Sequence, residues 1–509
     1  MKHFLLFTIF VSLFSCHLLF AQQNIPSDVL SVINTTKNKG ELMQTLEYYH
    51  RPEDSLKFKS ACFLIKNMPI HQSMTYYWAD SLDNELEFNE LAYTDFDASI
   101  QAFNTLKSKH GKVHPVPEKV SDLETMTSEY LIANIDDAFL HWNPQICSFE
   151  NFCEYILPYR VDVEPLSDWR ETYHDRFSKF IDINDPTPLD KKIKTLTSNL
   201  NLWFLCTYNL EKRKEPLPRL GAMQLLLRKK GTCEDVAGLS VFALRSMGIP
   251  ATVDIVPLWA TSTNGHVLNS AFDKNNQPVH FDALSLSDSL HEFIREPAKV
   301  FRSTYSIQPN TLATKIETQK IPSYGMLRAK NYKDVTHEYW KTRDVTCQLV
   351  HQDSMEEIVY ASVFNGGKWK PVWWGKAEGN AVTFSNMCQG AVFLPEYYRN
   401  GKLVIAGYPV ASGYDKVTVL KPDTATHTVT LRELPGYLKF RAGTNYVLAY
   451  YDIDRAWYVI GQQKAKDNMT EMVFHNVPKN ALLVLQPKLE GERKERVFTI
   501  SDTGERSWW

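Results

Sequence analysis

The chain has 509 residues, which is more than one hydrophobic core usually serves, so we expect two to four domains. Hydrophobic residues make up 44% and charged residues 23% of the sequence, values that exclude a disordered or fibrous protein. The 56 basic side chains nearly balance the 59 acidic ones, so no strong net field would attract nucleic acid. We therefore do not expect nucleic acid as a partner.

The N-terminal sequence predicts export. Basic Lys2 precedes an apolar run over residues 4–20, which ends at Ala21 before polar Gln22. This is the pattern of a cleavable signal peptide over residues 1–21, and it predicts a periplasmic, cell-surface or extracellular protein. A lipoprotein anchored through Cys16 is the less favoured alternative. No later segment has the length needed to span a bilayer, so we expect no transmembrane span in the mature chain.

The cysteines show no regular framework. Eight occur, seven of them after Ala21, and none forms a CxxC pair. An odd number in an exported chain leaves at least one thiol free unless it pairs between molecules. This slightly favours a functional cysteine, although free cysteines are also ordinary buried apolar residues.

The first third after the signal peptide, residues 22–190, is predicted to be mainly helical. Long amphipathic stretches such as Leu86–Phe103 and Met126–Trp142 are separated by prolines. After about residue 330 the pattern changes to short strands separated by turns rich in Gly, Pro, Asp and Asn. These strands predict two small all-β, sandwich-like modules at residues 335–434 and 436–509, with the boundary near Pro435 and Gly436.

The segment between these regions carries the chemistry. Thr232 and Asp235 resemble a capping box, and Gly248 followed by Pro250 is a stop signal, so a helix is predicted from Cys233 to about residue 247. Cys233 heads the core-facing stripe of this helix. The backbone N–H groups at a helix start lower the pKa of a thiol and can bind an oxyanion. An inert buried cysteine is the alternative interpretation.

A base and a carboxylate follow in a predicted hairpin. Strands at 266–272 and 278–282 flank a turn at 273–277. A turn centred on residue 274 places His266 opposite Asp282, and one centred on residue 275 leaves Asp282 a diagonal neighbour on the same face. Either register suits a cysteine nucleophile, a histidine base and an aspartate that orients the histidine.

The motifs in this segment are similar to the core of the transglutaminase-like superfamily. The run GTCEDVAGLSVFALRSMGIPA over residues 231–251, then GH with an asparagine at residues 265–269, then HFD at residues 280–282, carry the resemblance. The resemblance implies a papain-like fold with Cys233 as nucleophile, His266 as base and Asp282 as the orienting residue. The chain also resembles large secreted bacterial proteins of this type.

The sequence departs from the family pattern at Leu268, where a tryptophan is common. The shielding aromatic is then absent or is supplied by Trp259 or Trp203.

Other candidate residues fit less well. Asp254 lies on a different strand, Asp273 lies in the turn, and His280 is interpreted as an ordinary strand histidine. The pair His110 and His114 has a metal-ligand spacing, but Gly111 and Pro115 argue against the helix that it would need. No zinc pattern, Walker loop or GxGxxG occurs, so no metal and no cofactor are expected.

The sequence therefore predicts an α+β protein: a helical N-terminal region, a papain-like transglutaminase core at residues 191–325, and the two β modules. The leading hypothesis is an exported cysteine enzyme that acts on amide bonds of a protein or peptide, including cell-wall peptide, through an acyl-thioenzyme, with hydrolysis favoured over amine cross-linking. The alternative is an inactive scaffold whose β modules bind a glycan or a protein. Seven tryptophans after residue 335 motivate that alternative, although packing is the favoured explanation for them.

Overall fold

A computed structural model describes residues 25–209, 216–283, 293–350, 358–434, 438–488 and 496–509. The predicted signal peptide with Cys16, and Pro435 and Gly436 at the predicted module boundary, lie outside this range. The chain is α+β and divides into two compact units. The first comprises Met1–Val253, Val267–His291 and Thr304–Ile307, and the second comprises Asp254–His266, Glu292–Ser303 and Gln308–Trp509.

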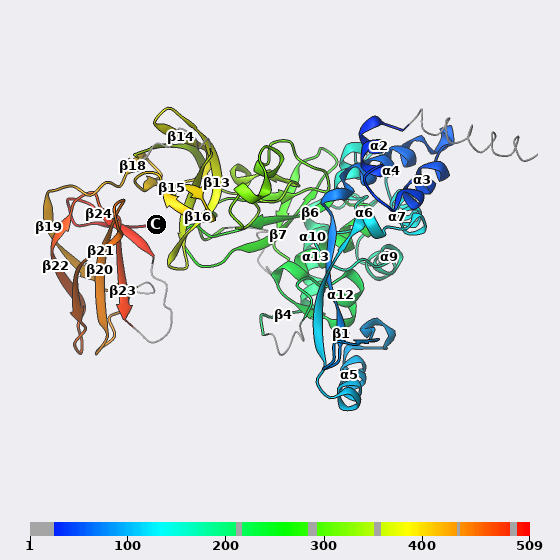
Figure 1. The fold of residues 1–509 in the computed structure, drawn as a ribbon, viewed down its shortest axis with the longest axis horizontal. Helices are drawn as coiled ribbons and strands as arrows, with labels where there is room; N and C mark the ends of the chain where they lie inside the picture. The colour runs from blue at the N-terminus through cyan, green and yellow to red at the C-terminus, as the bar shows by residue number, and fades with distance from the viewer. Residues whose placement is uncertain (1–24, 210–215, 284–292, 351–357, 435–437, 489–495) are drawn as a thin grey trace, which may run out of the picture. The chain divides into compact units, whose positions relative to one another are not determined.

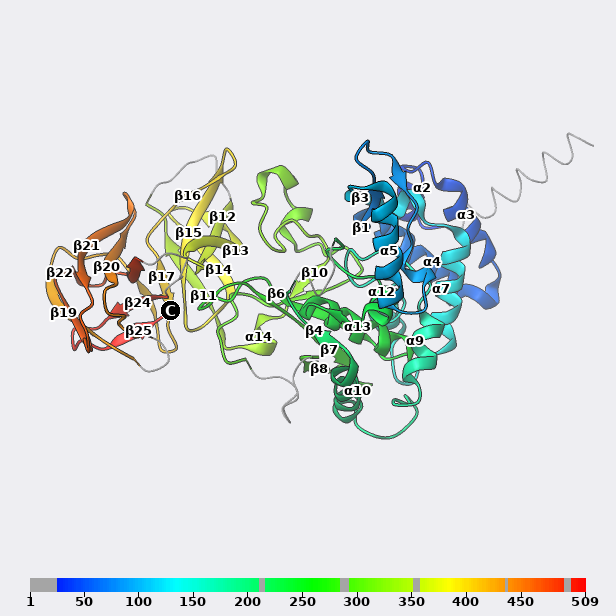
Figure 2. The ribbon, with the colours of Figure 1, turned by 90° about the horizontal axis from the view of Figure 1, so that it is seen from below.

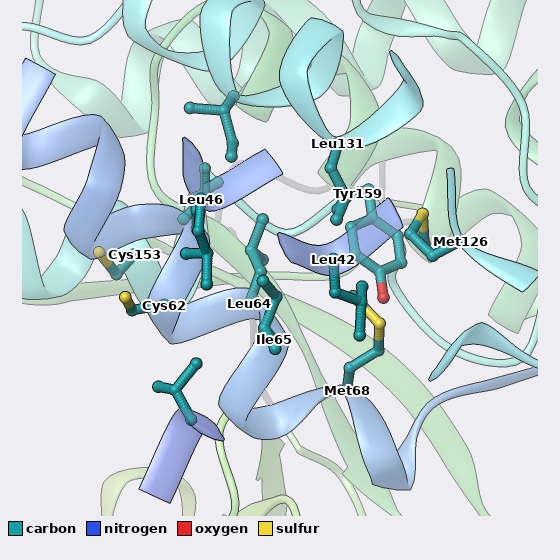
Figure 3. Packing of buried hydrophobic residues seen from close by; sticks show 14 of the residues in the cluster. Leu42, Leu46, Cys62, Leu64, Ile65, Met68, Met126, Leu131, Cys153 and Tyr159 are labelled. Atoms are coloured by element: carbon teal, nitrogen blue, oxygen red, sulfur yellow. The ribbon is translucent and has the colours of Figure 1, made fainter. Parts of the chain in front are cut away.

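The first unit contains most of the helices (Figure 1). They are α2 (Ser27–Ile33), α3 (Lys39–Tyr48), α4 (Ser55–Asn67), α5 (Phe96–His110), α6 (Asp122–Thr125), α7 (Ser128–Leu140), α8 (Phe149–Tyr155), α9 (Arg170–Phe177), α10 (Leu189–Trp203), α12 (Ala222–Arg228) and α13 (Cys233–Ser246). Helices α2, α3, α4 and α7 pack around one apolar core, which includes Leu64 and Ile65 of α4 and Leu131 of α7 (Figure 3). Within the described residues, no helix combines the length and apolar character needed to cross a bilayer.

A small sheet interrupts the helical region. Strands β1 (Gln72–Ala79), β2 (Glu85–Leu86) and β3 (His114–Ser121) are antiparallel in the order β2-β1-β3. The prediction of one helix over Leu86–Phe103 was therefore wrong, because the helix starts only at Phe96. The carboxylate of Asp95 accepts the N–H of Ala98 and caps α5, whereas the preceding residues include β2 and a short 3-10 helix at Glu90–Ala92.

The central sheet has the strand order β10-β9-β6-β7-β8. Its strands are β6 (Ala251–Val256), β7 (His266–Phe272), β8 (Pro278–Phe281), β9 (Phe301–Ser303) and β10 (Tyr332–Asp334), and short parallel strands β4 (Leu205–Cys206) and β5 (Lys230–Gly231) form a separate pair. Within the first unit, the side-chain amide of Asn269 on β7 donates to the carbonyl of Ala237 at 2.9 Å. This bond fixes β7 against the first turns of α13. Helix α10 packs beside β8 (Figure 2).

The end of α13 is fixed by Arg245 and Gly248, as the RSMGIPA motif predicts. Buried Arg245 donates from Nε to the carbonyls of Tyr155 and Ala251, both at 3.0 Å. Gly248 has φ +71°, and a Cβ on it would lie 2.0 Å from the carbonyl oxygen of His141. Only glycine fits this left-handed position, which ends the helix and turns the chain into β6.

The second unit is mainly β. It contains the four-residue helix α14 (Thr336–Tyr339) and an eight-stranded sheet of β11 (Thr342–Gln348), β12 (Ile358–Asn365), β13 (Lys368–Glu378), β14 (Ala381–Cys388), β15 (Ala391–Arg399), β16 (Lys402–Ile405), β17 (Val410–Ser412) and β18 (Val417–Val419). Its C-terminal strands are β19 (Thr426–Arg432), β20 (Asn445–Asp452), β21 (Ala456–Lys464), β22 (Glu471–Pro478), β23 (Leu483–Lys488), β24 (Val497–Ile500) and β25 (Arg506–Trp508). They form a two-stranded sheet, β19-β22, and a five-stranded sheet, β21-β20-β23-β24-β25.

The seven tryptophans of this region serve packing. All are partly buried and lie against one of four apolar clusters: Trp340, Trp369, Trp373, Trp374, Trp457, Trp508 and Trp509. Lys299 also lies over the ring of Trp373, with Nζ 4.1 Å from the ring centroid. Burial of these rings contributes to the stability of the β region.

Replacing Gly248 with alanine tests the helix end. We expect Gly248→Ala to lower the free energy of unfolding by at least about 2 kcal/mol, because it adds a left-handed strain and a clash. Gly238→Ala in α13 is the matched control, since a Cβ there meets nothing within 4 Å. This control should be neutral or stabilising by up to about 1 kcal/mol. Equal melting temperatures for the two variants would contradict the assignment.

The β region also buries a carboxylic acid. Glu396 of β15 is 5% exposed, and its Oε2 accepts no hydrogen bond from any residue that the structure describes. Burial raises the pKa of this carboxyl to about 7, and neighbouring Ser362 acts in the opposite direction. Because a glutamate in the unfolded chain titrates near ~4.3, the folded state holds an extra proton between these two pH values.

Stability should therefore fall as the pH rises from about 4.3 through about 7, because the buried Glu396 must then ionise. We expect Glu396→Gln to remove this dependence of stability on pH and to stabilise the β region at pH 8 by on the order of 3 kcal/mol. Melting temperatures measured from pH 4.5 to pH 8 check this expectation. Exposed Glu378→Gln is the control and should keep the wild-type slope.

Candidate active site

Residues 231–235 fold into a capped helix start. The backbone N–H of Thr232 donates to Asp235 Oδ2 at 2.7 Å, and the N–H of Asp235 donates to the Thr232 hydroxyl at 3.4 Å. These two bonds make the predicted capping box. A Cβ on Gly231 would lie 2.6 Å from the Asp235 Cβ, so the glycine gives the carboxylate room to fold back. The spacing GTCED follows from this geometry.

The capping box places Cys233 at the first position of α13. The side chain of Cys233 is 5% exposed, and its thiol donates to Glu234 Oε2 at 3.4 Å. The hydroxyl of Tyr208 lies beside the thiol and the backbone of Cys233. Burial, followed by this thiol contact, raises the pKa of Tyr208. The Cys233 thiol therefore has at least two polar neighbours, one of which belongs to a 63% exposed tyrosine.

The segment from 205 to 209 runs along the helix start. Strands β4 and β5 pair Cys206 with Gly231, and the N–H of Thr207 donates to the carbonyl of Gly231 at 2.7 Å. Burial raises the pKa of the Cys206 thiol to about 11, and the next largest contributions come from Cys233, Asp235 and Asp282. Cys233 and Asp282 are thus electrostatic neighbours of the same thiol.

The acidic charge at the helix start is partly balanced. Glu234 lies 3.9 Å from an Arg219 guanidinium nitrogen, and Arg219 also binds Asp162 at 3.0 Å. Burial acts to raise the pKa of Glu234, but Arg219, Thr232 and the Cys233 thiol lower it overall. The arginine therefore offsets part of the repulsion that Glu234 would impose on a thiolate.

The register of β7 and β8 places Asp282. Asn269 pairs with Phe281 and Ser270 with His280, so the turn is centred on residue 275, the second register considered from the sequence. Continuing this register by one residue puts Asp282 opposite Leu268. Leu268 and His266 share a face of β7 by alternation. The side-chain amide of Asn201 on α10 donates to the carbonyl of Ala283 at 3.0 Å, which fixes the chain directly after Asp282.

His266, the first residue of β7, is grouped with the second unit. Its imidazole stacks against the indole of Trp259, with ring centroids 6.3 Å apart and an interplanar angle of 21°. Trp259 is itself 8% exposed. Of the two aromatic residues proposed to replace the family tryptophan, Trp259 therefore lies against the candidate base. Trp203 instead carries Arg176 over its ring at 4.3 Å.

Two alternative carboxylates have structural roles. Asp254 is fully buried and accepts from Arg302 at 2.8 Å and from the Tyr339 hydroxyl at 2.5 Å. Asp273 closes the β7–β8 turn by accepting the N–H of Gln277 at 2.7 Å. These bonds occupy both side chains.

The structure also gives the surroundings of the other histidines considered from the sequence. His280 is hydrogen-bonded to Ser270 at 2.8 Å across the β7–β8 ribbon. His110 ends α5 whereas His114 begins β3, so the pair does not share a helix. In the described part of the chain, no group of three or more metal-ligating side chains comes together.

A family model described as the transglutaminase-like superfamily matches residues 182–283. Residues 182–283 form a transglutaminase-like domain. Cys233, His266 and Asp282 all lie within this segment. A transglutaminase from red sea bream has 12% identity over 84% of this chain and 76% of the other chain, with a TM-score of 0.21, too low to support an argument. No curated protein matches the chain.

The sequence did not reveal three residues near the start of α13 in this transglutaminase-like domain. Cys206, Tyr208 and Arg219 come from segments that show no motif, and only the folded chain brings them to the helix start. The prolines at 216 and 218 indicated a connection, but nothing in the sequence linked it to the cysteine.

Removing the cap should weaken the helix start. We expect Asp235→Ala to lower the free energy of unfolding by roughly 2–3 kcal/mol, because the cap is lost and the backbone N–H groups of Thr232 and Leu220 lose their acceptor. Glu234→Ala is the control next to it and should cost less than about 1 kcal/mol, since it accepts no capping bond. Urea unfolding of the full chain compares the two. A smaller loss for Asp235→Ala than for Glu234→Ala would contradict this interpretation.

Proposed function

We propose that the protein is a cysteine enzyme that acts on amide bonds through an acyl-thioenzyme, with Cys233 as nucleophile, His266 as base and Asp282 as the residue that orients the base. The observation that carries the proposal is the position of Cys233, at the first residue of a capped helix within a transglutaminase-like domain. A helix start favours the thiolate and presents backbone N–H groups to a developing oxyanion.

In the first step, the imidazole of His266 takes the proton of the Cys233 thiol, and the sulfur attacks the carbonyl carbon of the amide. The imidazolium then returns this proton to the nitrogen as the carbon–nitrogen bond breaks, so an amine or ammonia leaves and a thioester remains. Water, deprotonated by the imidazole, next attacks the thioester and releases a carboxylic acid and the thiol. The net reaction converts an amide and water into an acid and an amine.

Tyr208 and Glu234 define the approach to the sulfur in this proposal. Both lie beside Cys233, so we expect a substrate carbonyl to displace the Tyr208 hydroxyl as it approaches the sulfur. Tyr208 is 63% exposed, and its side chain can leave without opening the core. We propose a peptide or protein as substrate, and hydrolysis as the outcome because water requires no second binding site. Export through residues 1–21 remains part of the proposal.

Selective alkylation tests the nucleophile. Burial raises the pKa of the other thiols in the described residues, Cys62, Cys147, Cys153, Cys206, Cys347 and Cys388, which keeps them protonated at pH 7.5. We therefore expect iodoacetamide to label Cys233 first in the native protein, and His266→Ala to slow this labelling by at least about 10-fold. Peptide mapping by mass spectrometry over time measures the rates.

The matched control is His280→Ala, which removes a histidine from the same ribbon and should leave the Cys233 rate within about twofold of wild type. The proposal fails if all thiols react equally slowly, or if the two histidine variants behave alike. Mass spectrometry of a glutamine-containing peptide, incubated with and without an added primary amine, then separates hydrolysis, which converts the glutamine to glutamate, from cross-linking, which attaches the amine to the peptide.

A further inference from the structure

The loop between β6 and β7 leads directly into His266. A backbone hydrogen bond and a glycine fix the shape of this loop. The N–H of Trp259 donates to the carbonyl of Asn264 at 2.9 Å, which closes the loop. Asn264 has a left-handed φ of 59°. A Cβ on Gly265 would lie 2.2 Å from the carbonyl oxygen of Val256, so this residue must be glycine for the chain to turn back into β7. His266 follows directly.

A buried asparagine from the eight-stranded sheet holds this loop. Asn365 ends β12 and is fully buried. Its side-chain amide nitrogen donates to the carbonyl of Trp259 at 2.9 Å and to the carbonyl of Asn264 at 3.0 Å. These are the two residues that close the loop, so a single NH2 group bonds to both of its ends. Both amide hydrogens are used in this way.

The orientation of the Asn365 amide is also fixed. Lys370 Nζ, from the facing strand β13, donates to Asn365 Oδ1 at 2.9 Å. An ammonium group can only donate, so the oxygen of the amide must face Lys370 and the nitrogen must face the loop. The β12–β13 hairpin therefore presents a donor of defined direction rather than a freely rotating amide.

The same loop carries the aromatic support of the histidine. Trp259, whose carbonyl accepts from Asn365, stacks against His266 and makes an edge contact with Phe293, with ring centroids 5.2 Å apart. The loop is also bonded at Ala260, which donates to the carbonyl of Glu296 at 2.9 Å. A shift of the Trp259 backbone would move the ring on which the imidazole rests.

We infer that Asn365 is a positioning residue for His266, so that the eight-stranded sheet takes part in setting the geometry of the candidate base. This inference rests on the proposed function, in which His266 takes the Cys233 proton. Displacements of about 1 Å in a reacting group cost on the order of 100-fold in rate, so a hydrogen bond that fixes the loop affects proton transfer directly.

The test is the pH profile of Cys233 alkylation in full-length Asn365→Asp. This variant keeps the size of the side chain but replaces the two N–H donors with an acceptor that faces two carbonyl oxygens. We expect the inflection of the profile to move toward that of His266→Ala, and the rate at pH 7 to fall by about 10-fold. A folded Asn365→Asp protein with the wild-type profile would overturn the inference.

Val363→Ala controls for a purely structural effect. Val363 lies on the same strand and is fully buried in an apolar cluster that includes Ala260 of the loop, but its side chain has no hydrogen-bonding group. It should lower the melting temperature and leave the inflection unchanged. An equal shift in Val363→Ala would show that Asn365 acts only through stability, and would overturn the inference.

Two further variants keep the test decisive. If Asn365→Asp does not fold, Lys370→Gln removes the cation that orients the amide, and a smaller shift in the same direction supports the inference whereas an unchanged profile overturns it. If His266→Ala itself leaves the profile unchanged, the proposed function fails and the inference with it. If His266→Ala changes the profile and neither the Asn365 nor the Lys370 variant does, only the inference fails.

Discussion

The arrangement of the site depends on one carboxylate, that of Asp235. It accepts the N–H of Thr232 and the N–H of Leu220, and it folds over Gly231, which has no side chain to obstruct it. Without this bond set the first turn of α13 would have free N–H groups, and Cys233 would not be held at the helix start. The β4–β5 pairing and the position of Tyr208 beside Cys233 both depend on this helix start.

Local sequence rules predicted the elements that carry the motifs. The bounds of α13 agree with the prediction to within a residue, because a capping box and a left-handed glycine are signals that act over three or four residues. The start of β7 and the turn at Asp273 were predicted for the same reason. The family match over residues 182–283 agrees with the resemblance on which the fold was predicted.

Contacts between distant segments could not be predicted. The helix expected from Leu86 failed because its amphipathic pattern continues through β2 and a short 3-10 helix, and apolar spacing alone does not show where a helix begins. Tyr208 reaches Cys233, and Arg219 reaches Glu234, only through pairing and packing that the sequence does not encode locally. Likewise, residues 366–367 connect β12 to β13 in a hairpin, but nothing near Asn365 in the sequence indicates that its amide binds the loop before His266.

The bonds from Asn365 set a limit on how this chain can be rearranged in evolution or by protein engineering. The recognisable transglutaminase-like segment ends at residue 283, yet a donor for two of its loop carbonyls comes from residue 365. Grafting that segment alone into another protein would leave the carbonyls of Trp259 and Asn264 to be satisfied by solvent. Such a chimera would need a replacement donor at the same place, so the segment and the eight-stranded sheet are expected to be inherited together.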